Sequence, residues 1–230
     1  MPGDFSISQN WIGGSSLASA KFIPPNYRYI DELMGDVERF IHNESNNVPH
    51  LIKIAILHYQ FETIHPFLDG NGRVGRLLIT LYLVGQGILN KPALYLSDYL
   101  ERNRDEYYSH LTAIREKNQI IPWIKFFLKG IISTATNAKE TFIKIIQLQK
   151  DMEVKLHSFG TKSEKINTIL NSFYDTPILS VKDIVTRTGI ADKTTRNMIE
   201  LMLEEGLIKE MTGYGRNKLF IFEKYFNLFK

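Results

Sequence analysis

The chain has 230 residues, of which 43% are hydrophobic and 23% charged, so its composition is that of a folded globular protein and excludes a disordered chain. It contains no cysteine, which excludes disulfides and thiolate metal sites and is typical of a reducing compartment, so a cytoplasmic location is expected. The net charge of +3 is too small to indicate nucleic-acid binding by itself. The most apolar stretch, residues 120–132, is short and contains two lysines, so no membrane span is expected.

The N-terminal elements are predicted to be an extended flap and two helices. Residues 9–25 combine glycine pairs, serine-rich turns and apolar alternation, a pattern typical of a β-hairpin. Apolar residues then recur at helical spacing over 26–42 and again from residue 51. This second helix should end at Ile64 or His65, because Pro66 disfavours helical geometry in the residue before it.

The chain up to about residue 150 is predicted to be almost wholly helical. Residues 77–84 are apolar nearly all round, which indicates a central buried helix. Further helices are predicted over 103–116 and from Pro122 to about residue 150. The pattern breaks over 155–162, so we predict one domain over residues 1–155 and a second over 160–230.

The last seventy residues have a different rhythm. Helices are predicted over 163–173, from Ser180 and over 192–205, followed by strands over 207–210 and 218–222 that a Gly-Tyr-Gly hairpin joins. This order resembles a winged helix-turn-helix domain.

The densest group of chemically active side chains is residues 65–76, His-Pro-Phe-Leu-Asp-Gly-Asn-Gly-Arg-Val-Gly-Arg. Its glycines match the G-x-G-x-x-G pattern of dinucleotide-binding folds, but that motif follows a strand, whereas a helix precedes this one. No Gly-Lys-Ser/Thr ends the stretch, which excludes a Walker loop. The segment is therefore predicted to be a loop between two helices.

Such a loop is suited to an anion. Gly70 and Gly72 permit close backbone approach, and the loop leads into a helix N-terminus whose free N–H groups attract negative charge. Arg73 and Arg76 are three residues apart and lie on one side of the first turn, where two cations oppose the helix dipole. A bound phosphate would offset this conflict.

Two further residues complete the set. Asp69 is placed to hold a divalent ion beside phosphate oxygens, and His65 is a base whose ordinary pKa suits proton abstraction near neutral pH. Taken singly, each has a structural interpretation as a cap or a turn. Their combination favours a site for a nucleotide polyphosphate and a hydroxyl acceptor. A zinc pair of His58 and His65 is the weaker alternative, since no third ligand is nearby.

At these residues the sequence resembles the Fic family, whose signature His-Pro-Phe-x-Asp/Glu-Gly-Asn-Gly-Arg-x-x-Arg is met at every fixed position. The resemblance covers roughly residues 3–130, including flap borders at 10–14 and 23–25 and the helices that carry Tyr107 and Trp123. It implies a mainly α fold, a Fic-type helical bundle with a β-hairpin flap, followed here by the small winged-helix domain.

The resemblance also implies an activity: transfer of AMP from ATP, with Mg²⁺, to a Ser, Thr or Tyr hydroxyl of a target protein, with self-modification. By this resemblance His65 deprotonates the acceptor, Asp69 binds magnesium and Tyr107 lines the base pocket. The residues expected to hold the phosphates are Gly70, Asn71, Gly72, Arg73 and Arg76. The flap residues expected to pair with the protein substrate are Ser19, Ala20, Lys21 and Phe22.

Two departures from the family pattern matter. Many relatives carry Arg where this chain has Ser6. The Ser/Thr-x-x-x-Glu-Gly/Asn helix that commonly restrains Fic enzymes is not found, the nearest match being Thr112 to Glu116, which Lys117 follows. In similar proteins this inhibitory helix precedes the flap, so we expect a natural or engineered truncation that lacks it, with Arg76 free for the γ-phosphate.

Partners and rival functions remain open at this stage. The second domain could contact DNA through residues 180–220, or could dock a protein or a second copy of the chain as a homodimer. The residues expected to reach DNA are Lys193, Thr194, Thr195, Arg196, Asn197, Arg216 and Lys218. The rival functions are kinase-like phosphotransfer with a reversed nucleotide, and a transcription regulator that senses nucleotide.

Overall fold

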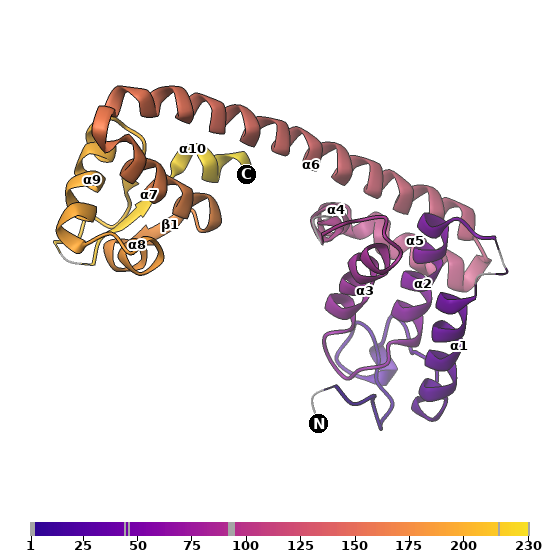
Figure 1. Cartoon of the computed structure of the whole chain (residues 1–230). Coiled ribbons are helices and arrows are strands. Elements are labelled where there is room, and N and C mark those ends of the chain that lie inside the picture. The colour runs from indigo at the N-terminus through magenta and orange to yellow at the C-terminus, as the bar shows by residue number, and fades with distance from the viewer. Residues whose placement is uncertain (1–2, 44, 46, 92–94, 216, 230) are drawn as a thin grey trace. The chain divides into compact units, whose positions relative to one another are not determined.

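A computed structural model describes all residues except 1–2, 44, 46, 92–94, 216 and 230 (Figure 1). The chain forms two compact units, residues 1–138 and 139–230, which are described separately below. Both are mainly helical, as predicted, and the strands found in the described part of the chain form one small sheet in the second unit.

The first unit is a bundle of helices. Its elements are η1 (Leu17–Ser19), η2 (Tyr27–Tyr29), α1 (Ile30–His42), α2 (His50–Ile64), α3 (Asn71–Gly85), α4 (Leu96–Arg102), α5 (Arg104–Lys117) and the first part of α6 (Ile120–Leu156). The helices predicted over 26–42, 51–64 and 103–116 are confirmed, whereas α4 was not predicted. Helix α3 begins inside the motif, so its first two turns carry Arg73 and Arg76.

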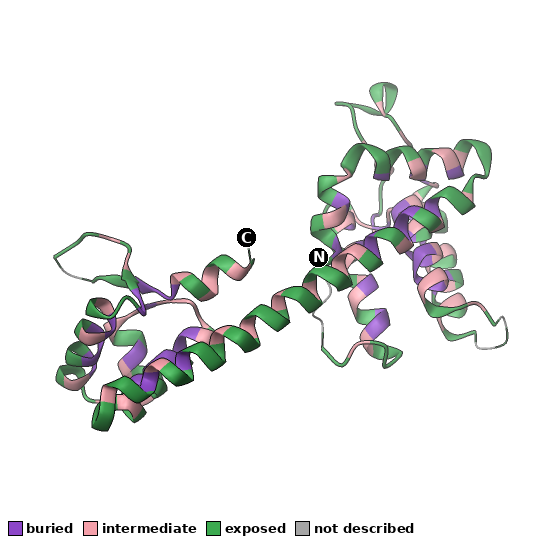
Figure 2. Cartoon of the chain, turned by 90° about the horizontal axis from the view of Figure 1, so that it is seen from above, coloured by how far each residue is buried: buried purple, intermediate pink, exposed green. Residues whose placement is uncertain are grey.

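The core of the first unit lies between α2, α3 and the start of α6. Fully buried Ile54 and Leu57 of α2 pack with Ile79 of α3. Figure 2 colours the buried parts of the chain purple. Trp123 of α6 is also fully buried, and its indole N–H donates to the Ala55 carbonyl at 3.0 Å. Burial of apolar side chains at about 25 cal/mol per Å² is the main stabilising contribution here, and it places the ends of α2 and α3 next to each other.

The flap differs in detail from the predicted β-hairpin. Its arms meet in a single antiparallel bridge between Ile12 and Phe22, and its tip contains the short 3-10 helix η1 instead of a continuous ladder. Gly14 explains part of this compact geometry: it has φ +76°, and a Cβ there would lie 2.2 Å from the Ser19 carbonyl oxygen. The tip therefore folds back on itself.

The second unit combines helices with a three-stranded sheet. Its elements are the rest of α6, η3 (His157–Lys162), α7 (Ser163–Asp175), β1 (Ile178–Ser180), α8 (Val181–Thr188), α9 (Asp192–Glu204), β2 (Lys209–Glu210), β3 (Leu219–Ile221), α10 (Glu223–Phe226) and η4 (Asn227–Phe229). The antiparallel sheet has the order β1-β3-β2, with Ile178 and Lys209 both opposite Ile221. Strand β1 and helix α10 were not predicted.

The core of the second unit is separate from that of the first. Ile166 and Phe173 of α7, Ile184 of α8 and Met202 of α9 are fully buried against Phe222. Helix α8 begins with a capping box in which Ser180 and Asp183 satisfy each other's backbone N–H groups.

A break in helical geometry lies within the region predicted as the domain boundary. Helix α6 ends at Leu156, and Gly160 in η3 has φ +55° and a non-helical ψ. The two compact units divide further upstream, inside α6. The domain limits 1–155 and 160–230 therefore stay a prediction.

Candidate active site

The motif begins where α2 ends. His65 has left-handed backbone geometry, with φ 52° and ψ 58°, and its N–H donates to the Phe61 carbonyl at 2.9 Å. This is the end that Pro66 predicted. From the N-terminal segment, the amide of Asn10 donates to the carbonyls of His65 and Phe67, at 3.1 and 3.0 Å. The unusual conformation of His65 is therefore held by a neighbouring segment.

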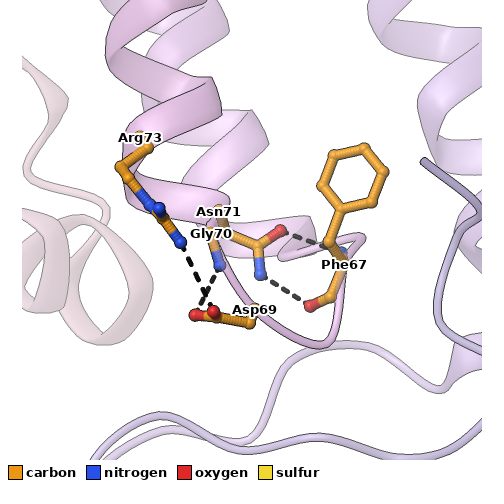
Figure 3. A network of polar contacts seen from close by, with 5 residues as sticks. All are labelled: Phe67, Asp69, Gly70, Asn71 and Arg73. Atoms are coloured by element: carbon orange, nitrogen blue, oxygen red, sulfur yellow. Dashed lines mark hydrogen bonds and ion pairs between the residues drawn. The ribbon is translucent and has the colours of Figure 1, made fainter. Parts of the chain in front are cut away.

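The loop that follows is closed by Asn71. Its Oδ1 accepts from the Phe67 N–H at 2.8 Å, and its Nδ2 donates to the Phe67 carbonyl at 2.6 Å (Figure 3). Asn71 is only 2% exposed, so both polar ends of its side chain are used inside the protein. Asn71 was predicted to cradle phosphate; the structure assigns its side chain to loop shape, which leaves its backbone N–H for that role.

Asp69 and Arg73 lie on the outer side of the same loop. Asp69 Oδ1 accepts from the Gly70 N–H at 2.7 Å, and its Oδ2 accepts from the Arg73 guanidinium at 3.3 Å (Figure 3). The side chain of Asp69 is 94% exposed, so this pair is weak and open to exchange with a ligand. Gly70 has φ 83°, and the N-terminus of α3 carries no side-chain cap. The backbone N–H groups predicted to bind an anion are therefore not occupied by a capping side chain.

The environment of His65 favours the neutral base. Burial lowers the pKa of the ring, the Glu62 carbonyl opposes this, and the positive charge of Arg115 lowers the pKa further. Neutral imidazole is the form that accepts a proton. Its Nδ1 is buried and has no hydrogen-bond partner among the described residues.

Glu62 is a site residue that the sequence analysis missed. It lies one turn before His65 on α2 and is 7% exposed, and its Oε1 has no hydrogen-bond partner in the described part of the chain. Burial raises the pKa of its carboxyl to about 7, against the opposing positive charges of Arg76 and Arg115. Arg76, predicted to be free of an acidic neighbour, therefore has one from α2. The available signal was that Glu62 is the one acidic residue of α2.

Tyr107 lies deeper than a nucleotide-lining residue would require. It is 5% exposed, and its hydroxyl is 3.0 Å from Nε2 of the fully buried His58. His58 Nδ1 lies 3.0 Å from the Gly75 carbonyl, which can only accept, so Nδ1 carries the proton and Nε2 accepts from Tyr107. Burial lowers the pKa of His58 to about 4, which keeps it neutral. Both nitrogens of His58 are thus engaged, and the role of Tyr107 toward a base stays a prediction.

The predicted flap residues divide into two pairs. Lys21 and Phe22 lie in the closure, where both of their N–H groups donate to the Ile12 carbonyl, at 3.0 and 3.2 Å. Ser19 and Ala20 lie at the tip, where the Ser19 hydroxyl accepts hydrogen bonds from the N–H groups of Ser15 and Ser16. The Phe22 ring packs on Arg115 of α5, a residue that the sequence analysis did not single out.

The site fits a magnesium ion held by one carboxylate. In the described ranges no three His, Asp or Glu residues come together as a metal cluster. Asp69 offers a single exposed carboxylate beside the cradle, and Mg²⁺ is commonly bound in this way, with phosphate oxygens and waters completing the shell.

Of the six described residues predicted to reach DNA, four are exposed in the second unit and one, Thr195, is buried. Thr195 is fully buried and its hydroxyl donates to the Ile190 carbonyl at 3.2 Å, so it cannot contact a base. Arg196 donates a hydrogen bond to Asp192 at 2.6 Å and Lys218 donates one to Glu210 at 2.8 Å, and both cations are exposed, so these pairs are weak. Arg216 lies outside the described residues.

Among the described residues no helix combines the length and the apolar character needed to cross a bilayer.

Comparison with known proteins finds similar sequences and structures for the segment that contains the site. Residues 3–83 match the model of the Fic/DOC family. Over 100 residues the chain is 39% identical to a protein of Aquifex aeolicus named probable protein adenylyltransferase. This match covers 44% of this chain and 28% of that protein. Over 125 residues it is 32% identical to the protein adenylyltransferase Fic of Drosophila melanogaster, covering 54% of this chain and 23% of that protein.

The chain therefore spans about a quarter of the length of these curated relatives. A crystal structure of a Fic family protein from Desulfovibrio desulfuricans G20 superposes on 96% of this chain and 62% of its own, with a TM-score of 0.52 and 22% identity. That likeness shows a shared fold.

Proposed function

We propose that this protein is an adenylyltransferase that moves AMP from ATP to a hydroxyl of a target protein. The observation that carries the proposal is the placement of a neutral base, His65, at the end of α2 beside the uncapped N-terminus of α3, which bears Arg73 and Arg76. The matched Fic/DOC segment contains all of these residues, and its relatives are named adenylyltransferases.

His65 takes the proton of the acceptor hydroxyl in the proposed reaction. The acceptor oxygen forms a bond to the α-phosphorus of ATP, the bond from that phosphorus to the α–β bridging oxygen breaks, and pyrophosphate leaves with the electron pair. The protein becomes an AMP ester. A base with a lowered pKa is deprotonated near neutral pH and is ready to accept this proton.

The rest of the motif binds and orients the polyphosphate. Backbone N–H groups at the start of α3 face the anion, while Arg73 and Arg76 carry positive charge for the leaving phosphates. When bound, Mg²⁺ would neutralise charge on the phosphate oxygens, and Asp69 is the residue that would hold it. Arg73 would exchange Asp69 for phosphate, since their present pair is exposed.

The test compares ATP labelled at the α- or the γ-phosphate, using the full chain, His65→Ala and, as a matched control, His42→Ala, an exposed histidine at the end of α1. We expect protein-bound label only from the α-position, loss of at least about a hundred-fold in His65→Ala, and unchanged transfer in His42→Ala. Transfer of γ-label would establish the phosphotransferase instead. No transfer together with tight operator binding would establish the nucleotide-sensing regulator.

The second unit is proposed to be a winged helix-turn-helix that docks a protein or a second copy of this chain. Its element order and its three-stranded sheet support the architecture. The near balance of charge over residues 151–230, with 12 Lys and Arg against 11 Asp and Glu, argues against strong phosphate contacts. Binding to a DNA duplex that weakens steeply with salt would overturn this preference, because phosphate contacts release counterions. The cytoplasmic location stays a prediction of the cysteine-free composition.

A further inference from the structure

Arg115, near the end of α5, contacts two other parts of the first unit. Its guanidinium carbon lies 3.7 Å from the ring centroid of Phe22 in the flap. On its other side, Nε donates to the Thr63 hydroxyl at 3.3 Å and a terminal nitrogen donates to the Glu62 carbonyl at 3.4 Å. One planar side chain therefore joins α5, the last turn of α2 and the flap.

The contact with Phe22 is at the point where the flap closes. The Ile12 N–H donates to the Phe22 carbonyl at 2.9 Å, and the Phe22 N–H donates back to the Ile12 carbonyl at 3.2 Å. The first arm of the flap is fastened separately, through Asn10 to the motif loop. The second arm reaches the helical core through the Phe22 ring. Fixing this ring therefore holds the second arm of the flap near the end of α2, as Asn10 holds the first arm.

We propose that Arg115 is a positioning residue: it anchors the flap to the helix end that carries His65, and so sets where a protein acceptor lies relative to the base. This inference rests on the proposed function, because it assumes that the acceptor binds along the flap. Arg115 does not touch the reacting atoms. It acts through Phe22 and through the last turn of α2.

The chemistry of arginine suits this role. A guanidinium can stack on an aromatic face while its edge donates hydrogen bonds in the same plane, whereas a lysine ammonium can do only one of these well. Arg115 is partly buried: burial lowers the pKa of its guanidinium, and the Tyr59, Glu62 and Tyr107 side chains oppose this. Its charge also lowers the pKa of His65. Arg115→Met removes both the charge and the planar group, whereas Arg115→Lys removes only the planar group. The two variants should therefore differ in their effect on the pKa of His65.

The experiment uses the full chain with Arg115→Met, Arg115→Lys and the matched control Arg104→Met, because Arg104 also lies over an aromatic ring on α5, at 5.7 Å from Tyr108, but does not contact the flap. Amide hydrogen exchange is measured at Ile12, Lys21 and Phe22. We expect exchange about ten-fold faster at these amides in both Arg115 variants, the size expected for loss of one partly buried cation–π contact. The control should match the parent chain.

Activity provides a second readout. With the inactive His65→Ala chain as acceptor and α-labelled ATP as donor, KM for the acceptor should rise about ten-fold in both Arg115 variants, with kcat within about two-fold. The acidic limb of the pH–rate profile should move to higher pH in Arg115→Met, which loses the charge, and stay in place in Arg115→Lys, which keeps it. A residue that only ties α5 to α2 would lower stability without either effect.

Unchanged flap exchange in Arg115→Met would overturn the inference whatever the activity. Absence of label transfer in the parent chain would instead overturn the proposed function, and flap exchange would still decide the role of Arg115. Should Arg115→Met fail to fold, as judged by the fluorescence of buried Trp123, Phe22→Leu removes the same contact from the flap side. Faster exchange in Phe22→Leu would support the inference, and unchanged exchange would contradict it.

Discussion

The Glu62 carboxyl occupies the space beside Gly75 where a side chain would begin. A Cβ on Gly75 would lie 2.5 Å from Glu62 Oε1 and 3.1 Å from Phe61 Cδ1. The third glycine of the motif therefore serves the packing of α3 against α2, and not a phosphate. This close approach also brings the carboxyl near Arg76, whose charge acts on it.

Replacement of Gly75 by alanine should destabilise the first unit. The new methyl group would push against a buried carboxyl and an aromatic ring, an overpacking that typically costs about 1–3 kcal/mol. Gly85→Ala, at the end of the same helix, meets nothing within 4 Å and should be neutral or slightly stabilising. Urea unfolding of both variants measures the difference, and equal stabilities would contradict the close packing.

Replacement of Glu62 by glutamine should flatten part of the pH dependence of stability. The pKa of Glu62 is raised from 4.5 to about 7, so the folded state favours the protonated acid. The stability that this contributes is fully present below pH 4.5 and is lost as the pH rises through about 7, a change of about 3 kcal/mol. Glu62→Gln stays neutral, so its free energy of unfolding should rise relative to that of the parent chain by about this amount between pH 4.5 and 8.

The difference between the two chains isolates this group. His58, whose lowered pKa gives the opposite dependence, is present in both chains and cancels. Glu32→Gln, at an exposed position of α1, serves as the control and should show no such gain. A parent-minus-variant difference that is flat from pH 4.5 to 8, measured by thermal unfolding, would mean that Glu62 is solvated.

Removal of the Tyr107 hydroxyl should be costly. Tyr107→Phe leaves Nε2 of fully buried His58 without its donor, and an unsatisfied buried acceptor costs about 1–3 kcal/mol. Tyr108→Phe, at a neighbouring side chain that is 47% exposed, should change stability by less than about 0.5 kcal/mol. Chemical denaturation compares the two, and similar effects would argue against the assigned hydrogen bond.

Replacement of Asn71 by alanine should loosen the motif loop. Both hydrogen bonds to Phe67 would be lost, and we expect a loss of about 1–3 kcal/mol and faster amide exchange at Phe67. Asn103→Ala removes a single hydrogen bond, to the Tyr99 carbonyl, and should cost less, about 0.5–1.5 kcal/mol. Unchanged exchange at Phe67 would show that Asn71 does not shape the loop.

The twelve motif residues and the helices that flank them could be predicted from the sequence. Helical periodicity, the proline after His65 and the glycine before α3 act through neighbours along the chain, so the local sequence is enough to predict these elements. The flap was predicted in outline only, because the tight contact of Gly14 with Ser19 limits its pairing to one bridge. Short elements such as α4 and β1 carry too few residues for a periodic signal.

Packing decided which residues surround the motif. The carboxyl beside Arg76, the hydrogen bond that commits Tyr107 to His58 and the stacking of Phe22 on Arg115 all join residues far apart in the chain. No pattern in the sequence encodes such pairs, because they form only when amphipathic helices bury their apolar faces against one another. The sequence by itself thus determined which groups could do the chemistry, and the tertiary structure decided their charge states and their neighbours.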